Sequence, residues 1–145
     1  MGTKRALLDP NILEQIEIEL TLYGTAIAEL LELRDELART LARFFTKYDL
    51  LLCPTIPVEA WSIDQLGLER IDGETAGPRG HAGFTPIFSY CGVPALSLPC
   101  EYGRKRLPVD IQIVGERYSD GRVIQAAAAM EQALDLHFAA PMLMS

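Results

Sequence analysis

Nucleophilic side chains are scattered along these 145 residues rather than grouped. The five serines lie far apart, at Ser62, Ser89, Ser97, Ser119 and Ser145. None stands in the GxSxG pattern that places a serine on a sharp strand-to-helix turn. The two histidines form no HExxH pair, and no glycine-rich nucleotide loop occurs. The sequence therefore contains no complete catalytic centre of a known type, and it indicates neither a metal site nor an organic cofactor.

The three cysteines carry the remaining nucleophilic chemistry. Cys53, Cys91 and Cys100 are widely spaced and form no CxxC pair, so neither a zinc site nor a redox motif is indicated. One alternative is a cysteine hydrolase in which His81 serves as base for Cys91, because the two flank one predicted short helix. A reactive cysteine needs an electropositive, partly exposed setting. Since Cys91 stands among apolar residues, a structural thiol is the favoured interpretation.

Composition restricts the class of protein. Apolar residues make up 49% and charged residues 23%, which is typical of one globular domain. The net charge of -7 and the absence of a long basic cluster argue against nucleic-acid binding. No apolar run is long enough for a membrane span, and residues 1–5 lead into no signal peptide. We therefore expect a cytoplasmic protein without a membrane partner.

Helical periodicity appears in three long segments. Residues 9–23 and 25–47 predict two helices, with Gly24 ending the first. The apolar stripe of the second contains Ile27, Leu30, Leu31, Leu37, Leu41, Phe44 and Phe45. Residues 119–136 predict the last helix. Its inward positions are Val123, Ile124, Ala127, Met130 and Leu134.

Short apolar runs bounded by proline or glycine predict the strands. They cover residues 49–53, 95–98 and 109–114, and the first two read as strands that are buried on both faces. A short helix is expected within residues 83–91, ended by Gly92. Residues 62–83 hold five of the eleven glycines and no apolar periodicity, so we expect a mobile loop there. Residues 1–145 should thus form a single α/β unit.

Three blocks of sequence, taken in order, resemble one known family. The first is residues 45–57, which contains Asp49-Leu50-Leu51-Leu52-Cys53-Pro54-Thr55. The second runs from Phe84-Thr85-Pro86 to Gly92-Val93-Pro94-Ala95 and ends at Cys100, and the third is residues 107–115. Their order resembles the C-terminal third of the amidase signature family. The resemblance implies an α/β fold with a mixed sheet flanked by helices, the C-terminal part of the amidase signature fold.

The resemblance also implies a mechanism for a larger parent protein. Family members cleave amides through a Ser–Ser–Lys set, which lies in a Gly- and Ser-rich segment of their N-terminal two-thirds. No Ser-Ser pair exists here, so no catalytic residue carries over. Asp110 departs from the family pattern, because a glycine is common at that place. We expect a C-terminal fragment of an amidase-type hydrolase that is inactive alone; the alternative is a non-catalytic binding or assembly module on the same scaffold.

What carries over is part of the wall of a substrate pocket. The resemblance suggests Cys53, Pro54 and Thr55 at the strand exit, and Cys91 before the Gly-x-Pro-Ala block. The parent would bind a small-molecule amide without metal or cofactor. The fragment interpretation leaves strand edges and apolar surfaces uncovered, so we expect this chain to form a homodimer through them. A monomer whose helices wrap both faces of the sheet is the alternative.

Overall fold

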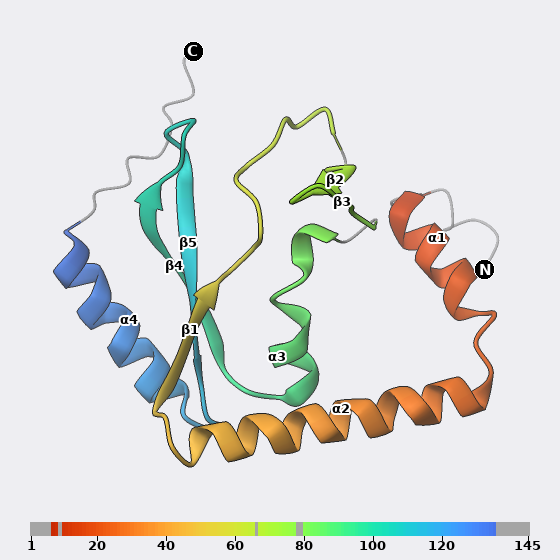
Figure 1. The fold of residues 1–145 in the computed structure, drawn as a ribbon, viewed down its shortest axis with the longest axis horizontal. Helices are drawn as coiled ribbons and strands as arrows, with labels where there is room; N and C mark the ends of the chain where they lie inside the picture. The colour runs from red at the N-terminus through yellow and green to blue at the C-terminus, as the bar shows by residue number, and fades with distance from the viewer. Residues whose placement is uncertain (1–6, 9, 66, 78–79, 136–145) are drawn as a thin grey trace. The chain divides into compact units, whose positions relative to one another are not determined.

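The computed structural model describes residues 7–8, 10–65, 67–77 and 80–135. The chain divides into two compact units, Met1–Glu36 and Leu37–Ser145. In chain order the elements are α1 (Pro10–Glu19), α2 (Gly24–Phe45), β1 (Leu50–Pro54), β2 (Arg70–Ile71), β3 (Glu74–Thr75), η2 (Gly80–Ala82), α3 (Pro86–Cys91), β4 (Ala95–Tyr102), β5 (Pro108–Gly115) and α4 (Asp120–Leu134), as Figure 1 shows.

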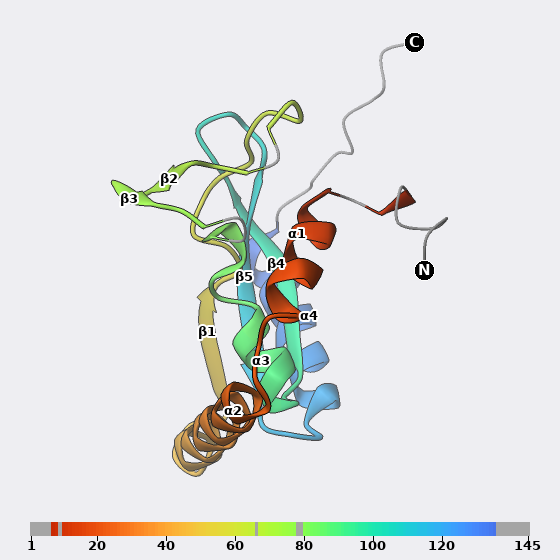
Figure 2. The ribbon, with the colours of Figure 1, turned by 90° about the vertical axis from the view of Figure 1, so that its right-hand side faces the viewer.

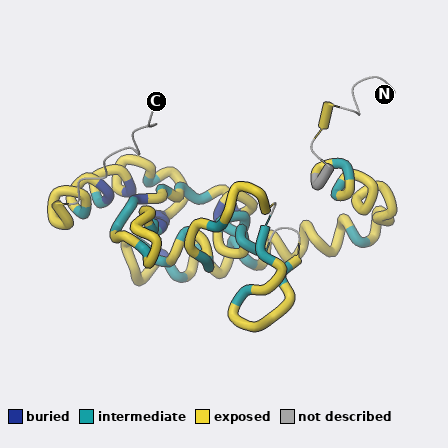
Figure 3. The backbone as a smooth tube through the Cα atoms, turned by 90° about the horizontal axis from the view of Figure 1, so that it is seen from above, coloured by how far each residue is buried: buried dark blue, intermediate teal, exposed yellow. Residues whose placement is uncertain are grey.

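The first unit contains α1 and most of α2. Helix α1 is shorter than predicted, because the chain leaves it in a turn in which the Thr21 hydroxyl donates to the carbonyl of Ile18 at 2.6 Å. Gly24 therefore begins α2 rather than ending α1, and Asp9, the expected cap, lies outside the described residues. No residue described in this unit is buried, as Figure 3 shows by the absence of dark blue there.

The core of the second unit is a three-stranded sheet in the order β1-β5-β4. Both β1 and β4 pair antiparallel with β5, and Ile113 lies opposite Leu52 on one side and Leu96 on the other. The predicted α/β class is confirmed. The sequence suggested a mixed sheet; the three strands of this sheet are antiparallel because β4 and β5 form a hairpin and β1 adds to the free side of β5.

Each face of the sheet carries its own apolar cluster. On one face Ile113 packs against Val123 and Ala127 of α4. On the other, Val114 packs against Phe45 of α2 and Phe88 of α3. Successive side chains of a strand point to opposite faces, so one strand serves both clusters. Figure 1 shows α4 and α3 on opposite sides of the sheet, and Figure 2 views the sheet from the side of α3.

Several predictions of burial are wrong. Leu134 was predicted to face inward but is 39% exposed, and the stripe of the second helix is exposed at Ile27, Leu30 and Leu31. The sequence predicts Leu52 in a strand buried on both faces, yet its side chain is 49% exposed. The apolar cluster between α4 and the sheet includes Leu50, which lies on the same face of β1 as Leu52. Because β1 is an edge strand of this sheet, Leu52 has a neighbouring strand on one side only. Ile124 is predicted to face inward but is 59% exposed, because Val123 and Ala127, four residues apart, define the buried stripe of α4.

Helix α3 ends where glycine is predicted to end it. Gly92 adopts the left-handed conformation with φ of 65°, and the turn is closed by hydrogen bonds from Gly92 to Ser89 and from Val93 to Phe88. A side chain at Gly92 would be strained in this conformation. The helix begins later than the sequence suggested, at Pro86, whose fixed φ suits a first turn.

The segment 62–83 contains more local structure than its composition suggested. Strands β2 and β3 form a two-stranded ribbon, and the turn between them has positive φ at Asp72 and Gly73. Trp61, just before this segment, lies 5.1 Å from His81, measured between ring centroids. The mobility of the segment stays a prediction. In the part of the chain that the structure describes, no helix is both long and apolar enough to cross a membrane.

Candidate functional site

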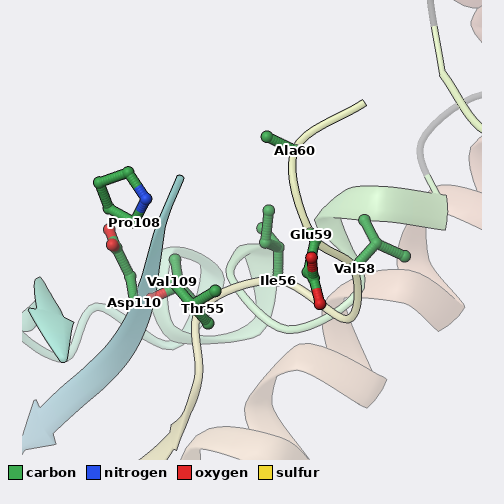
Figure 4. Close-up of a pocket in the computed structure, with 8 residues that line it drawn as sticks. All are labelled: Thr55, Ile56, Val58, Glu59, Ala60, Pro108, Val109 and Asp110. Carbon is green, nitrogen blue, oxygen red and sulfur yellow. The ribbon is translucent and has the colours of Figure 1, made fainter. Parts of the chain in front are cut away.

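The exit of β1 passes close to the start of β5. Pro54 ends β1, and the backbone N–H of Thr55 donates to the carbonyl of Asp110 at 3.3 Å. Pro57 fixes its own φ and restricts the preceding Ile56, and the chain bends over residues 55–58. The segment 55–60 therefore runs beside the first residues of β5 and forms a wall opposite them (Figure 4).

A chain of hydrogen bonds joins the strands at this point. The Ser97 hydroxyl on β4 donates to Oδ2 of Asp110 on β5 at 2.8 Å. The Thr55 hydroxyl lies 2.8 Å from that of Ser97. Since a hydroxyl has one proton and Ser97 gives its proton to Asp110, Thr55 donates to Ser97. Three residues far apart in sequence thus form the ordered row Thr55–Ser97–Asp110.

Beside this row lies a pocket of about 160 Å³. Its lining residues come from the β1 exit and the start of β5, and they are Thr55, Ile56, Val58, Glu59, Ala60, Pro108, Val109 and Asp110. The two carboxylates belong to Glu59 and Asp110, and no basic residue is among the lining residues. Figure 4 shows the Asp110 side chain on β5 and the Glu59 side chain on the facing segment. Most of the pocket wall is apolar. Val109 and Asp110 are successive residues of β5, so their side chains point to opposite faces, and the Asp110 carboxylate binds Ser97 on the face away from Val109.

Glu59 is fastened to the hairpin turn that joins β4 and β5. Its Oε2 accepts from the backbone N–H of Arg104 at 3.0 Å, and its Oε1 lies 3.7 Å from Nε of Arg104. The Arg104 side chain is 95% exposed, so this ion pair adds little stability. A Cβ at Gly103 would lie 2.9 Å from Oε2 of Glu59. Glycine at position 103 therefore allows the turn to approach Glu59 closely.

The sequence-predicted wall residues lie at different depths. Thr55 lines the pocket, Pro54 is exposed, and Cys53 is half-buried behind them. The Cys53 sulfur accepts a 3.5 Å hydrogen bond from the amide of Gln112, a buried polar residue. Cys91 is buried at the end of α3 and is not a lining residue of this pocket. That these four residues wall a substrate pocket stays a prediction.

Helix α3 separates the alternative cysteine–histidine pair. His81 lies in η2, before α3, and Cys91 is the last residue of α3. Six helical residues span about 9 Å. His81 contacts Trp61, and Cys91 is buried. A catalytic thiol needs an electropositive, partly exposed setting, so this arrangement favours the structural interpretation of Cys91.

Cys100 occupies a bulge of β4, close to Asp110 of the row Thr55–Ser97–Asp110. The strand register shifts between Pro99 and Glu101, and the Cys100 thiol donates to the carbonyl of Val109 at 3.4 Å. Burial raises the pKa of this thiol, and the negative charges of Asp110 and Glu101 raise the pKa further, against a smaller lowering by a backbone hydrogen bond. A raised pKa keeps the sulfur protonated, which disfavours a nucleophilic role.

Sequence reasoning missed Ser97, Glu59 and Asp110 as residues of the site. Asp110 did leave a signal, because it stands where a glycine is common in the resembled family. Ser97 and Glu59 left none, since their roles depend on strand register and on the path of the β1 exit. Among the residues that the structure describes, no three His, Cys, Asp or Glu side chains are grouped so that they could hold a metal ion.

Comparison with known proteins places the chain in a family. It is 28% identical over 114 residues to a glutamyl-tRNA(Gln) amidotransferase subunit from Alkaliphilus metalliredigens, covering 79% of this chain and 22% of that protein. It is 32% identical over 103 residues to the protein of that name from Halothermothrix orenii, covering 70% of this chain and 20% of the relative. The chain thus spans about a fifth of the length of these relatives.

A solved structure gives the same result. The chain matches a bacterial aryl acylamidase of the amidase signature enzymes with a TM-score of 0.77 and 29% identity, over 91% of this chain and 28% of that one. The family model described as Amidase matches residues 6–124. The resemblance that the three sequence blocks suggested is confirmed, and the chain belongs to the amidase signature family.

Proposed function

We propose that these residues form the C-terminal part of the scaffold of an amidase-type hydrolase that cleaves carboxylic amides in the cytoplasm. The observation that carries this proposal is the family match over residues 6–124, in a chain that spans 22% of a matched relative. The pocket at the β1 exit supports it, because Thr55, one of the four residues expected to wall the substrate, lines this pocket. The parent protein would bind a small amide and use no metal or organic cofactor.

We infer further that the 145 residues do not catalyse amide hydrolysis alone. Acyl transfer needs an activated nucleophile and donors for the oxyanion. The sequence has no Ser-Ser pair, and its three lysines, Lys4, Lys47 and Lys105, have no serine-rich segment beside them. The hydroxyl of Ser97 is engaged with Asp110 and Thr55 rather than with a base such as lysine or histidine.

Purified chain is therefore expected to hydrolyse simple amides and esters no faster than the buffer does. Release of 4-nitroaniline from an acyl anilide, followed by absorbance, measures this, with an intact amidase of the family as positive control. The Cys91→Ala variant, assayed in parallel, reports on the alternative thiol chemistry. Reproducible turnover by the unaltered chain would contradict the inference, and its loss in Cys91→Ala would assign that turnover to a cysteine mechanism.

We also propose that the chain associates with a second copy through its uncovered apolar surfaces. Along α2 the side chains of Ile27, Leu30 and Leu31 are 49%, 56% and 48% exposed. Within the sheet of the second unit, β1 and β4 are both edge strands, with one neighbour each. Apolar stripes and free strand edges recruit other chains, and a twofold dimer is the simplest closed arrangement.

Sedimentation equilibrium at micromolar concentration is expected to give twice the chain mass of 16.0 kDa. Leu30→Glu places a charge on the exposed stripe of α2 and should shift the equilibrium toward monomer. Glu29→Gln, one position away on the same helix, is the matched control and should leave the mass unchanged. A monomer of 16.0 kDa that shows no dependence on concentration would exclude the dimer.

A further inference from the structure

The outer edge of β1 carries backbone groups that no strand of the described residues bonds. The neighbour of β1 in its sheet is β5, and the N–H of Thr55, just past β1, donates to the carbonyl of Asp110 on β5. In an antiparallel pair of strands, hydrogen-bonded residue pairs alternate with pairs whose backbone groups point away from the partner strand. Counting back from Thr55, Leu50 and Leu52 belong to the second kind. Their N–H and C=O groups therefore point out of the sheet edge.

The two edge strands of this sheet differ in how well they are protected against further pairing. The N–H of Gly115 donates to the carbonyl of Pro94, so by the same alternation the backbone groups of Ala95 and Ser97 point outward from β4. On that edge Pro99 lacks an N–H, and the strand register shifts just after it. Prolines, bulges and charged side chains keep strand edges from recruiting another strand. β1 has a proline only at its last position and no charged side chain, so β1 is the less protected edge.

We propose that β1 pairs antiparallel with β1 of a second copy of this chain, around a twofold axis at Leu51, so that the two sheets join into one. In this register Leu50 of each copy lies opposite Leu52 of the other, and each such pair exchanges two hydrogen bonds. The N–H and C=O groups of both leucines are then bonded. The next pair would place Pro54 opposite Tyr48 of the second copy, and the Tyr48 N–H already donates to Phe44. The pairing therefore ends by itself on both sides.

The side chains at this register favour a second copy over an unrelated strand. Leu52 is 49% exposed, and it lies on the same face of β1 as Leu50, which packs in the α4 cluster. Pairing around the axis places the exposed Leu52 against Leu50 of the other copy, and the reverse contact forms by symmetry. Apolar side chains that meet across neighbouring strands stabilise a sheet. Sliding the register by two residues would set Leu50 opposite Pro54, which has no N–H to donate.

This inference rests on the self-association proposed above and names its interface. Hydrogen exchange of backbone amides, followed by NMR in the unaltered chain, tests the interface directly. The amides of Leu50 and Leu52 are expected to exchange at least about tenfold more slowly at a protein concentration where the dimer forms than at one where it dissociates. The outward amides of Ala95 and Ser97 on β4 are the internal control, and their exchange should stay fast at both concentrations.

Leu52→Lys places a charge on the paired edge, where its side chain is half-exposed and the fold tolerates it. It is expected to raise the dissociation constant of the dimer at least about tenfold. Leu107→Lys is the matched control, because Leu107 is 42% exposed and lies between β4 and β5, away from β1. Sedimentation equilibrium of both variants measures the difference.

The outcomes separate this interface from self-association in general. A dimer in which the Leu50 and Leu52 amides still exchange fast would overturn the β1 pairing and leave self-association standing. Equal dimerisation by folded Leu52→Lys and Leu107→Lys would do the same, as would slow exchange at Ala95 and Ser97 instead. A chain that stays monomeric with a freely exchanging Leu52 amide would overturn both proposals, and would leave this edge open to a strand of another protein.

Discussion

Ile113→Ala is expected to lower the free energy of unfolding of the second unit by about 2–5 kcal/mol. Ile113 is fully buried, with 0% exposure, at the centre of β5. It lies between Leu52 and Leu96 of the flanking strands and packs against Val123 of α4. Removing three carbons there leaves a cavity that strands held on both sides cannot close. Urea unfolding followed by circular dichroism measures the change, as a lower midpoint with an unchanged slope.

The matched control is Ile63→Ala, because it deletes the same atoms from a side chain that is 99% exposed. Its effect on the free energy of unfolding should stay within about 0.5 kcal/mol. If both variants lose similar stability, the loss does not come from the core. It then arises because replacing isoleucine by alanine changes the free energy of the unfolded chain. If neither does, the sheet of this unit is not the part that unfolds cooperatively.

The sequence predicted the order and type of the main elements because their signals are local. Gly92 ends α3 in a left-handed conformation that favours glycine, and the periodicity of α4 identified Val123 and Ala127 correctly. The continuous apolar run at Leu50 identified β1. Each of these depends on residues within about one helical turn or one strand, which is the range that periodicity and turn chemistry cover.

Strand ends were predicted less well, because whether a proline ends a strand depends on where that strand lies in the sheet. The second strand was expected to stop before Pro99, yet β4 continues to Tyr102, and Pro99 lies opposite Asp110. β4 is an edge strand, where a proline without an N–H can be accommodated on the unpaired side. Whether a strand lies at an edge depends on sheet order, which is a property of the fold and not of the local sequence.

The candidate site was the least predictable part for the same reason. The contact between the hydroxyls of Thr55 and Ser97 joins residues 42 positions apart. It exists because β1 and β4 both pair with β5 in one particular register, and a slip of one residue would turn these side chains to the other face. Only the resemblance drawn from the sequence marked Asp110 as a departure, and only the structure shows that it accepts a hydrogen bond from Ser97.

The second large effect on stability is expected at Gly115, the last residue of β5, where a substitution adds a side-chain atom. Gly115 is buried, and its N–H donates to the carbonyl of Pro94 at 3.0 Å. A Cβ added there would lie 2.5 Å from the Ser119 hydroxyl and 2.6 Å from a methyl of Val123. The hydroxyl can rotate, but Val123 is 2% exposed and held in the α4 cluster. The start of α4 must therefore move away from the sheet to admit the methyl group.

Gly115→Ala is accordingly expected to destabilise the second unit by about 1–3 kcal/mol, the usual cost of overpacking. Gly121→Ala is the matched control, because Gly121 lies in α4 with no atom within 4 Å of an added Cβ. Alanine in a helix is favoured over glycine, so this variant should be neutral or gain up to about 1 kcal/mol. Thermal unfolding of both variants measures the difference in sign. A Gly115→Ala variant as stable as Gly121→Ala would show that α4 is free to shift on the sheet, and that the packing of Val123 does not fix its position.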